Sequence, residues 1–199
     1  MIVVFDIGNV LVRWNPRNLF RQTMKDEARM ERFLSTALAM DFVSLTDIVA
    51  DFSQAVAERA RAFPEFAREL HLFDERWVET LGAPIEENVA LLRRLRSAGR
   101  PVYALSNFAT VKFAIARQMY DFLNEFDAAV ISGHVGAAKP DPRIYALLFK
   151  QVGREPQELV FVDDSLRNIE AARAAGMAAI HFRPGLDLEG ELKAHGALP

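Results

Sequence analysis

The chain contains no cysteine, and this absence excludes disulfides, thiolate metal sites and cysteine nucleophiles. It also has no excess of charge of one sign, because 24 basic and 27 acidic residues leave a formal charge of −3. Such a balance gives no electrostatic reason to expect nucleic acid or an anionic membrane as a partner. No uninterrupted apolar run approaches the length that spans a bilayer.

Two further absences concern location and organisation. The first residues lack the basic head and the small-residue cleavage site of a signal peptide, so we expect a cytoplasmic protein. The sequence contains no internal repeat and no low-complexity segment. Its 199 residues suffice for one full domain with a modest insertion, and nothing in them indicates an oligomeric state.

Short β-branched and aromatic runs alternate with helical patterns along most of the chain. Five runs predict strands, over residues 2–6, 101–106, 128–131, 159–163 and 178–182. Apolar spacings of three and four predict helices between them, one ending at Gly99 and one running from Ser165 as N-cap to Gly176 as C-cap. This alternation predicts an α/β fold with a doubly wound parallel sheet.

The segment 15–84 interrupts this alternation, because it has helical patterns over 28–38, 45–61 and 64–81 and no convincing strand. It is far too long for a simple connection. We therefore expect residues 1–14 and 85–199 to form the core and residues 15–84 to form a helical cap. A cap over the C-terminal edge of the sheet would exclude water and select substrates.

Acidic residues close two of the predicted strands. Asp6 ends the first, and Asp163 and Asp164 end the fourth. Ligands of open parallel sheets bind beyond the C-terminal ends of the strands, so these acids are expected to meet there. Three converging carboxylates repel one another unless a cation lies between them, and Mg²⁺ is the ion that such oxygen ligands suit.

Four segments at strand ends occur in a fixed order along the chain. They are Asp6-Ile7-Gly8-Asn9-Val10, Leu105-Ser106-Asn107, Lys139-Pro140-Asp141-Pro142 and Val162-Asp163-Asp164-Ser165. Together they resemble the haloacid dehalogenase (HAD) superfamily of phosphotransferases, over residues 1 to about 182. The helical insertion stands where that family carries a helical cap of the C1 type. The resemblance implies a Rossmann-like core and a Mg²⁺-dependent phosphatase acting on a small phosphorylated metabolite.

The resemblance also implies a role for each motif. Asp6 is expected to attack phosphorus and form an aspartyl-phosphate. Lys139 is expected to neutralise this nucleophile and the transferring group, while Ser106 and the backbone amide of Asn107 hold phosphoryl oxygens.

The expected metal site completes this set of roles. Mg²⁺ would be held by Asp6, Asp164 and the Gly8 carbonyl, with Asp163 as a further ligand or a supporting acid. Asn168, one helical turn after Ser165, is expected to steady the metal side of the site.

One position departs from the family pattern. Most phosphatases of the family carry a second aspartate two residues after the nucleophile, where it exchanges protons with the leaving group and with water. Here that residue is Gly8, and the amide of Asn9 does not titrate in its place. The Asp-x-Gly-Asn-Val form is similar to a branch of bacterial sugar phosphatases that act on α-glucose-1-phosphate, so a sugar phosphate is the first expectation. Substrate hydroxyls, metal-bound water or an acid of the cap would supply the proton.

Two other functions stay open at this point. A 2-haloacid dehalogenase shares the nucleophile, and Lys139 with Tyr145 would suit it, although it has no use for the acid pair. A protein that binds a phosphorylated ligand or a partner without turnover would also explain Gly8. The apolar stripe that would serve such docking, or pack the interior of the cap, is Phe63, Phe66, Leu70, Phe73 and Trp77.

Specificity residues are expected in the cap, facing Asp6. The candidates are Trp14, His71, Arg76 and Trp77. Trp77 is the one expected to bind substrate, by stacking on a sugar ring, and its alternative role is packing within the cap.

Overall fold

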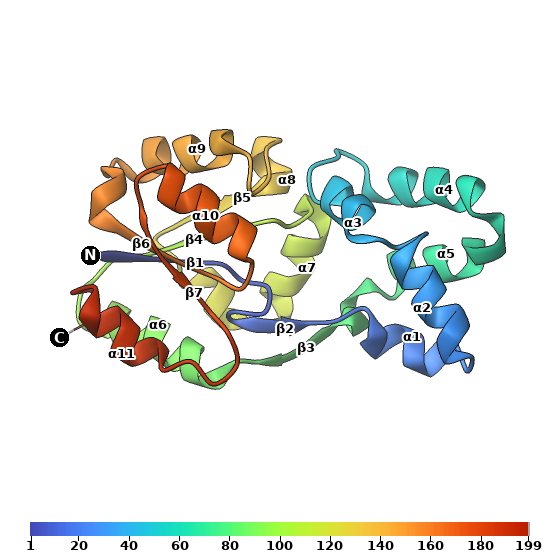
Figure 1. The fold of residues 1–199 in the computed structure, drawn as a ribbon, viewed down its shortest axis with the longest axis horizontal. Helices are drawn as coiled ribbons and strands as arrows, with labels where there is room; N and C mark the ends of the chain where they lie inside the picture. The colour runs from blue at the N-terminus through green and yellow to red at the C-terminus, as the bar shows by residue number, and fades with distance from the viewer. Residues whose placement is uncertain (199) are drawn as a thin grey trace.

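Five parallel strands form a central sheet in the order β5-β4-β1-β6-β7 (Figure 1). In the computed structural model, which describes residues 1–198, they are β1 (Ile2–Phe5), β4 (Val102–Ser106), β5 (Ala128–Ile131), β6 (Leu159–Asp163) and β7 (Ala178–His181). Each lies within one residue of a predicted run. The α/β fold with a parallel sheet is therefore confirmed, and its switch point places β1 between β4 and β6.

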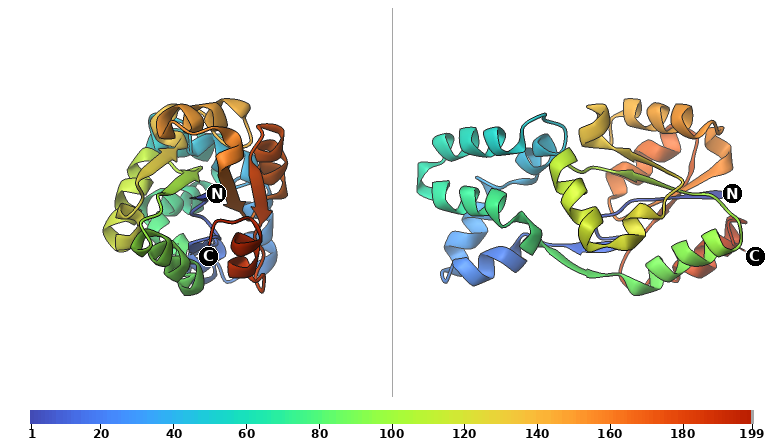
Figure 2. Two further views of the ribbon diagram at one scale, coloured as in Figure 1. Left: turned by 90° about the vertical axis from the view of Figure 1, so that its left-hand side faces the viewer. Right: turned by 180° about the vertical axis from the view of Figure 1, so that it is seen from behind.

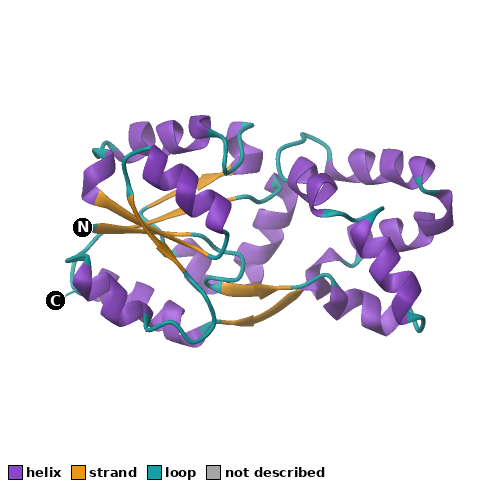
Figure 3. Cartoon of the chain, in the orientation of Figure 1, coloured by secondary structure: helices purple, strands orange, loops and turns teal. Residues whose placement is uncertain are grey.

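Helices cover both faces of the sheet, as a doubly wound fold requires (Figure 3). Alternate residues of β1 supply the two cores: Val4 packs on one face, while Val3 and Phe5 pack on the other. The helices on the Val4 face are α9 (Pro142–Val152) and α10 (Leu166–Ala174). Those on the opposite face are α6 (Glu86–Ser97), α7 (Thr110–Met119) and α11 (Leu188–Ala194). The remaining short elements of the core are α8 (Ser132–Val135), η3 (Asp121–Asn124) and η4 (Pro156–Glu158).

The expected helix ends are present where glycine permits a left-handed backbone. Gly99 follows α6 with φ 69°, and Gly176 follows α10 with φ 92°. Ser165 occupies the N-cap position of α10, but its side chain makes no capping hydrogen bond. None of the helices in residues 1–198 is long and apolar enough to cross a membrane.

Five helices between residues 17 and 75 form a separate lobe beside the strand ends (Figure 2). They are α1 (Arg17–Thr23), α2 (Glu27–Ser35), α3 (Met40–Thr46), α4 (Phe52–Ala62) and α5 (Ala67–Glu75), with the 3-10 turns η1 (Pro64–Phe66) and η2 (Trp77–Thr80). This arrangement supports the proposed division into a core of residues 1–14 and 85–199 and a cap of residues 15–84. Within the cap, Phe66, Leu70 and Phe73 are almost fully buried, so most of the apolar stripe packs inside it.

The expectation of no strand between residues 15 and 84 was wrong. The chain enters and leaves the cap through a two-stranded antiparallel ribbon, β2 (Val12–Trp14) and β3 (Leu81–Pro84). Each strand is too short to show an alternating pattern, and β3 contains Gly82 and Pro84, which are unfavourable in strands. Pairing between segments distant in sequence makes this ribbon, and local patterns do not report it.

The predicted helix over residues 45–61 was also wrong as one continuous element. The structure ends α3 at Thr46 and begins α4 at Phe52. Asp51 caps the second helix, since its side chain accepts a hydrogen bond from the Gln54 amide at 2.9 Å. The break leaves Asp47 in a turn that faces the strand ends of the core.

Candidate active site

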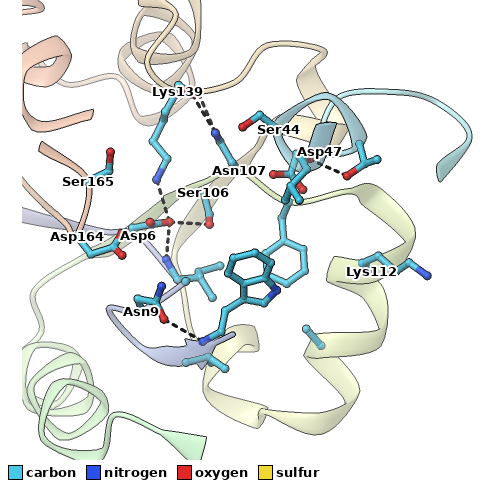
Figure 4. A pocket seen from close by; sticks show the side chains of 18 of the residues that line it. Asp6, Asn9, Ser44, Asp47, Ser106, Asn107, Lys112, Lys139, Asp164 and Ser165 are labelled. Carbon is cyan, nitrogen blue, oxygen red and sulfur yellow. Dashed lines mark hydrogen bonds and ion pairs between the residues drawn. The ribbon is translucent and has the colours of Figure 1, made fainter. Parts of the chain in front are cut away.

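The ends of β1, β4 and β6 bring the first three predicted site residues together. These strands are neighbours in the sheet, and pairing of Phe5 with Ala104 and with Val162 sets their register. Asp6, Ser106 and Asp163 therefore emerge at the same edge of the sheet. Figure 4 shows Asp6 beside Ser106 there. Ser106 Oγ donates a hydrogen bond to Asp6 Oδ1 at 2.7 Å, across 100 residues of sequence.

Lys139 reaches this edge from the loop that precedes α9. Its Nζ lies 2.9 Å from Asp6 Oδ1 and 2.6 Å from Asp163 Oδ2, and only 1% of its side chain is exposed. Burial opposes the charge of Lys139, but the carboxylates of Asp163 and Asp6 outweigh that effect and raise its pKa. Lys139 is therefore a fixed cation between two acids.

Asn107 holds the loop that carries Lys139. Its side-chain Oδ1 accepts a hydrogen bond from the Lys139 backbone amide at 2.8 Å, and its Nδ2 donates to the Lys139 carbonyl at 3.0 Å. Sequence reasoning assigned a task only to the backbone amide of Asn107. The side-chain clamp is an additional contribution that only the tertiary structure makes visible.

Asp6 has one oxygen fully engaged and one oxygen available. Its Oδ1 accepts hydrogen bonds from the Ile7 amide and from Ser106, and it pairs with Lys139. Burial raises the pKa of Asp6 to about 7, and the charge of Asp163 adds to the rise while Lys139 opposes it. Lys139 alone thus does not compensate both acids, and a further cation would stabilise ionised Asp6.

Asp163 is committed to its protein partners. It is fully buried, and it accepts hydrogen bonds from Lys139, from Asn168 Nδ2 at 3.1 Å and from the Ser165 amide at 2.7 Å. Ser165 lies at the predicted N-cap position of α10, and its backbone amide, not its side chain, makes the contact with Asp163. Asp163 is therefore better suited to support the site than to be a principal metal ligand.

The three acids are close enough to share a cation. One oxygen from each of Asp6, Asp163 and Asp164 lies within 4.8 Å of the others. Asp164 is the most exposed of them, and burial together with the charge of Asp163 raises its pKa, although a hydrogen bond from Asn9 opposes that rise. The donor set of hard carboxylate oxygens, with the Gly8 carbonyl in the adjoining loop, fits Mg²⁺.

Gly8 stands where most phosphatases of the family carry a second aspartate, and the space beside it is open. A Cβ atom built there meets nothing within 4 Å. The following residue, Asn9, has a left-handed backbone with φ 54°, and its side chain accepts a hydrogen bond from the Trp14 amide at 2.9 Å. The loop is thus held by Asn9 and places no carboxyl group of its own beside Asp6.

A carboxyl group from the cap faces this open position. Asp47, in the turn after α3, lines the same cavity as Asp6 and Gly8 (Figure 4). The turn is tied to the core because the Asp47 carbonyl accepts a hydrogen bond from Ser132 Oγ, which in turn accepts one from the Phe108 amide. Burial raises the pKa of Asp47 to about 7, the charge of Asp6 adds to the rise, and Lys139 and the Ala109 amide oppose it.

Sequence reasoning missed Asp47 because a helical pattern continues through it. The only local signal of a break was Asp51, an acid of the type that caps helices, four residues later. The prediction that an acid of the cap supplies the proton therefore named no residue, because the sequence pattern does not show this turn.

Only two of the four candidate specificity residues line the cavity. Trp14 and Trp77 line the cavity, which has a volume of about 450 Å³. Arg76 instead forms an ion pair with Glu79, at 2.6 and 2.8 Å, and His71 is exposed on α5, so neither contributes to the lining. Trp77 is 93% buried and packs edge-on against Phe108, with ring centroids 5.6 Å apart, which leaves it a wall of the cavity and not a free stacking surface.

Comparisons with known proteins agree with this geometry. A family model described as haloacid dehalogenase-like hydrolase matches residues 1–176. The sesquiterpene phosphatase AstK of Aspergillus oryzae is 28% identical over 92% of this chain and 90% of its own length. The drimenol cyclase DrtB of Aspergillus calidoustus is 33% identical over 46% of this chain, which spans only 17% of that longer protein.

Solved structures show the same fold. A HAD family enzyme of Bacteroides thetaiotaomicron, in a magnesium complex, has a TM-score of 0.73 and 21% identity, over 96% of this chain and 98% of its own. The L-2-haloacid dehalogenase of Xanthobacter autotrophicus has a TM-score of 0.66 and 20% identity, over 100% of this chain and 85% of its own. Likeness at such identity concerns the fold and leaves the reaction open.

Proposed function

Because the chain belongs to the haloacid dehalogenase-like hydrolases, we propose that it is a Mg²⁺-dependent phosphatase acting through an aspartyl-phosphate at Asp6. The observation that carries the proposal is the environment of Asp6. One oxygen is fixed by Lys139, Ser106 and a backbone amide within 2.9 Å, while the other is left to react. A small phosphorylated metabolite is the proposed substrate, since a capped cavity admits small molecules.

The first step forms a bond between an Asp6 oxygen and phosphorus and breaks the bond from phosphorus to the organic oxygen. Lys139 and Ser106 stand where negative charge spreads over the phosphoryl oxygens, as does the Asn107 backbone amide. Mg²⁺ held by Asp6, Asp164 and the Gly8 carbonyl would offset the repulsion between the attacking carboxylate and the phosphate dianion. Asp163 would hold Lys139 and the loop of Asp164 in place.

Asp47 is the group we propose for the proton transfers. Its carboxyl group would give a proton to the leaving organic oxygen, which departs as an alcohol. Its carboxylate would then take a proton from the water that attacks the aspartyl-phosphate, releasing phosphate and restoring Asp6. Support comes from its position in the cavity opposite the acid-free loop at Gly8, and from a pKa that burial raises to about 7.

The dehalogenase alternative is less well supported. The Tyr145 hydroxyl, which suited it, donates a hydrogen bond to the Asn168 carbonyl at 2.9 Å and is fully buried with its ring. The three-acid group would be poorly compensated in an enzyme that uses no cation. Chelation separates the two functions, since it should abolish phosphatase activity and leave a dehalogenase unaffected.

The substrate panel should contain phosphate monoesters whose organic groups differ in chemistry. Sugar phosphates belong in it because the Asp-x-Gly-Asn-Val form resembles sugar phosphatases. A sesquiterpenyl phosphate belongs in it because AstK is named for such substrates. That the substrate is a small molecule in the cytoplasm, with no nucleic acid or membrane as partner, remains a prediction.

The decisive experiment is phosphate release from this panel and from p-nitrophenyl phosphate, with Mg²⁺ and with chelator. Asp6→Asn should remove turnover, whereas Asp141→Asn, which alters a half-buried carboxylate that pairs with Arg143 outside the cavity, should leave most of it. Full activity in Asp6→Asn would exclude the proposed nucleophile. Release of a single equivalent without further turnover would favour the binding protein.

A further inference from the structure

The cavity has two chemically different ends. The end on the core carries Asp6, Lys139 and Asp164 at the sheet edge. The other end is enclosed by side chains that we call the apolar wall, defined as Val43, Phe52, Phe73, Trp77, Leu81 and Phe108. These residues come from α3, α4, α5, η2, β3 and the loop after β4, so cap and core build the wall together.

The wall is preformed. Its aromatic rings pack on one another, with Trp77 and Phe108 at 5.6 Å and Phe52 and Phe73 at 5.7 Å between centroids. Phe73 is 1% exposed and Phe52 is 4% exposed, so these rings are fixed between the wall and the interior of the cap. Rigid apolar surface of this kind binds hydrocarbon without first having to be ordered.

Two polar side chains at this end, Lys112 and Tyr120, are already engaged by the protein. Lys112 lies across the cavity from Asp6 in Figure 4, and its Nζ donates to the Asp74 carbonyl at 2.9 Å and pairs with the Asp74 carboxylate at 2.8 Å. Its Nζ also lies 4.2 Å from the centre of the Phe52 ring. The Tyr120 hydroxyl donates to the Gly82 carbonyl at 2.8 Å.

The side-chain hydroxyl groups of α3 add no free hydrogen-bonding partner at the apolar wall. Thr46 Oγ1 donates to the Val43 carbonyl at 2.7 Å, and Ser44 lies near Asp47, on the side of the acids (Figure 4). A sugar held against the apolar wall would have several hydroxyl groups that lose water and find few partners there, which is unfavourable. A hydrocarbon group there would lose only contact with water.

From this division of the cavity we propose that the organic group of the substrate is mainly hydrocarbon, so that the enzyme cleaves alkyl or isoprenoid-like phosphate monoesters in preference to sugar phosphates. The proposal rests on the proposed phosphatase function. The phosphate would lie against Asp6 and Lys139, and the chain would extend along the apolar wall towards Phe73. The hydrolysis is the one written above, with the alcohol as the leaving group.

The test is a series of n-alkyl phosphates from two to eight carbons, compared with glucose 1-phosphate, glucose 6-phosphate and p-nitrophenyl phosphate. We expect kcat/KM to rise about fourfold with each added methylene, the factor that corresponds to burying that group, until the cavity is filled. Both sugar phosphates should fall well below the longer chains. A flat series, or higher kcat/KM for either sugar phosphate, would overturn the proposal.

A conservative variant guards against a misleading loss of folding. Val43→Thr keeps the shape of a wall residue and replaces one methyl group by a hydroxyl, so it should lower kcat/KM for octyl phosphate and reduce the dependence on chain length. Val111→Thr makes the same change at an exposed position of α7 and should alter nothing. Equal behaviour of the two variants on octyl phosphate would contradict a role for the wall.

Binding separates this proposal from the phosphatase function itself. Alkyl phosphonates, in which a carbon–phosphorus bond replaces the ester linkage and cannot be hydrolysed, are titrated into the Mg²⁺-loaded protein by calorimetry. Affinity that rises with chain length, with an increasingly negative heat-capacity change, supports the apolar site even if no substrate is turned over. Activity on p-nitrophenyl phosphate with affinity independent of chain length would leave the phosphatase standing and refute the apolar substrate.

Discussion

Replacing Asp47 with asparagine should make the protein more stable at alkaline pH and much less active. Asp47 is half-buried where it lines the cavity with Asp6, and burial raises the pKa of its carboxyl group to about 7, far above the ordinary value of 3.8. In the folded state it therefore keeps its proton up to about pH 7, whereas in the unfolded chain it loses it near pH 4. Stability consequently falls as the pH rises from about 4 to about 7, and the loss persists above that range.

The size of the effect follows from the same two pKa values. At about 1.36 kcal/mol per pH unit, the difference between 3.8 and about 7 corresponds to at most about 4 kcal/mol. Water entering the cavity relieves part of this, and asparagine brings an amide group that needs its own partner, so we expect a gain of about 2 kcal/mol at pH 8. For a chain of this size that corresponds to a midpoint roughly 4–8 °C higher.

The assay is thermal unfolding of wild type and Asp47→Asn at pH 4.5 and pH 8 in metal-free buffer. The gain should appear at pH 8 and nearly vanish at pH 4.5, where the carboxyl group is protonated in the folded state. Glu75→Gln, an exposed acid of the same cap, should show no such dependence. A variant that is equally stable or less stable than wild type at pH 8 would show that burial of the ionised Asp47 carboxylate does not destabilise the folded protein.

The kinetic half of this prediction uses leaving groups. Loss of a proton donor should lower kcat about a hundredfold on alkyl phosphates, whose alcohols leave poorly, and less than tenfold on p-nitrophenyl phosphate. The alkaline fall in kcat for alkyl phosphates, which we expect above about pH 7, should disappear in Asp47→Asn. Equal losses on both substrates would instead point to a role in closing the cap.

Three other changes test the rest of the site. Gly8→Asp adds a carboxyl group at a position where a Cβ atom meets nothing within 4 Å. Combined with Asp47→Asn, it should raise kcat on alkyl phosphates at least tenfold above that of Asp47→Asn alone. No recovery in a folded, Mg²⁺-binding double variant would contradict the proton-transfer role of Asp47. Asn107→Ala removes both side-chain hydrogen bonds to the Lys139 backbone. Urea titration should show that the free energy of unfolding falls by about 1–3 kcal/mol, and kcat should fall as well. Unchanged values would show that the loop of Lys139 keeps its conformation without Asn107. Asp163→Asn should raise the KM or activation constant for Mg²⁺ at least tenfold in titrations of activity, and an unaltered constant would exclude a supporting role for this acid.

Much of the site could be predicted because its residues sit at the ends of regular elements. Asp6, Ser106 and Asp163 close strands whose apolar runs are visible in the sequence, and parallel strands present their C-terminal ends at one edge. Asp164 was predicted from its place directly after Asp163, and Lys139 followed from the family motif. The geometry brings all five together, while their proposed catalytic roles still await the assays described above.

What could not be predicted depends on the cap. The ribbon of β2 and β3 is made by pairing across about seventy residues, and neither strand carries a pattern of its own. Arg76 and Trp77 are adjacent in sequence, yet one pairs with Glu79 and the other walls the cavity, because a turn separates their directions. No local spacing distinguishes these outcomes.

The parallel sheet, the edge at which the acids gather and the absence of an acid at Gly8 can all be inferred from the amino-acid pattern, because apolar periodicity and the residues at strand ends are visible along the chain. That Asp47 lines the same cavity as Gly8, and that the far end of this cavity is apolar, is visible only in the folded protein. Both depend on how the helical lobe packs beside the strand ends of the sheet, and contacts between distant segments, which the sequence pattern does not identify, determine that packing.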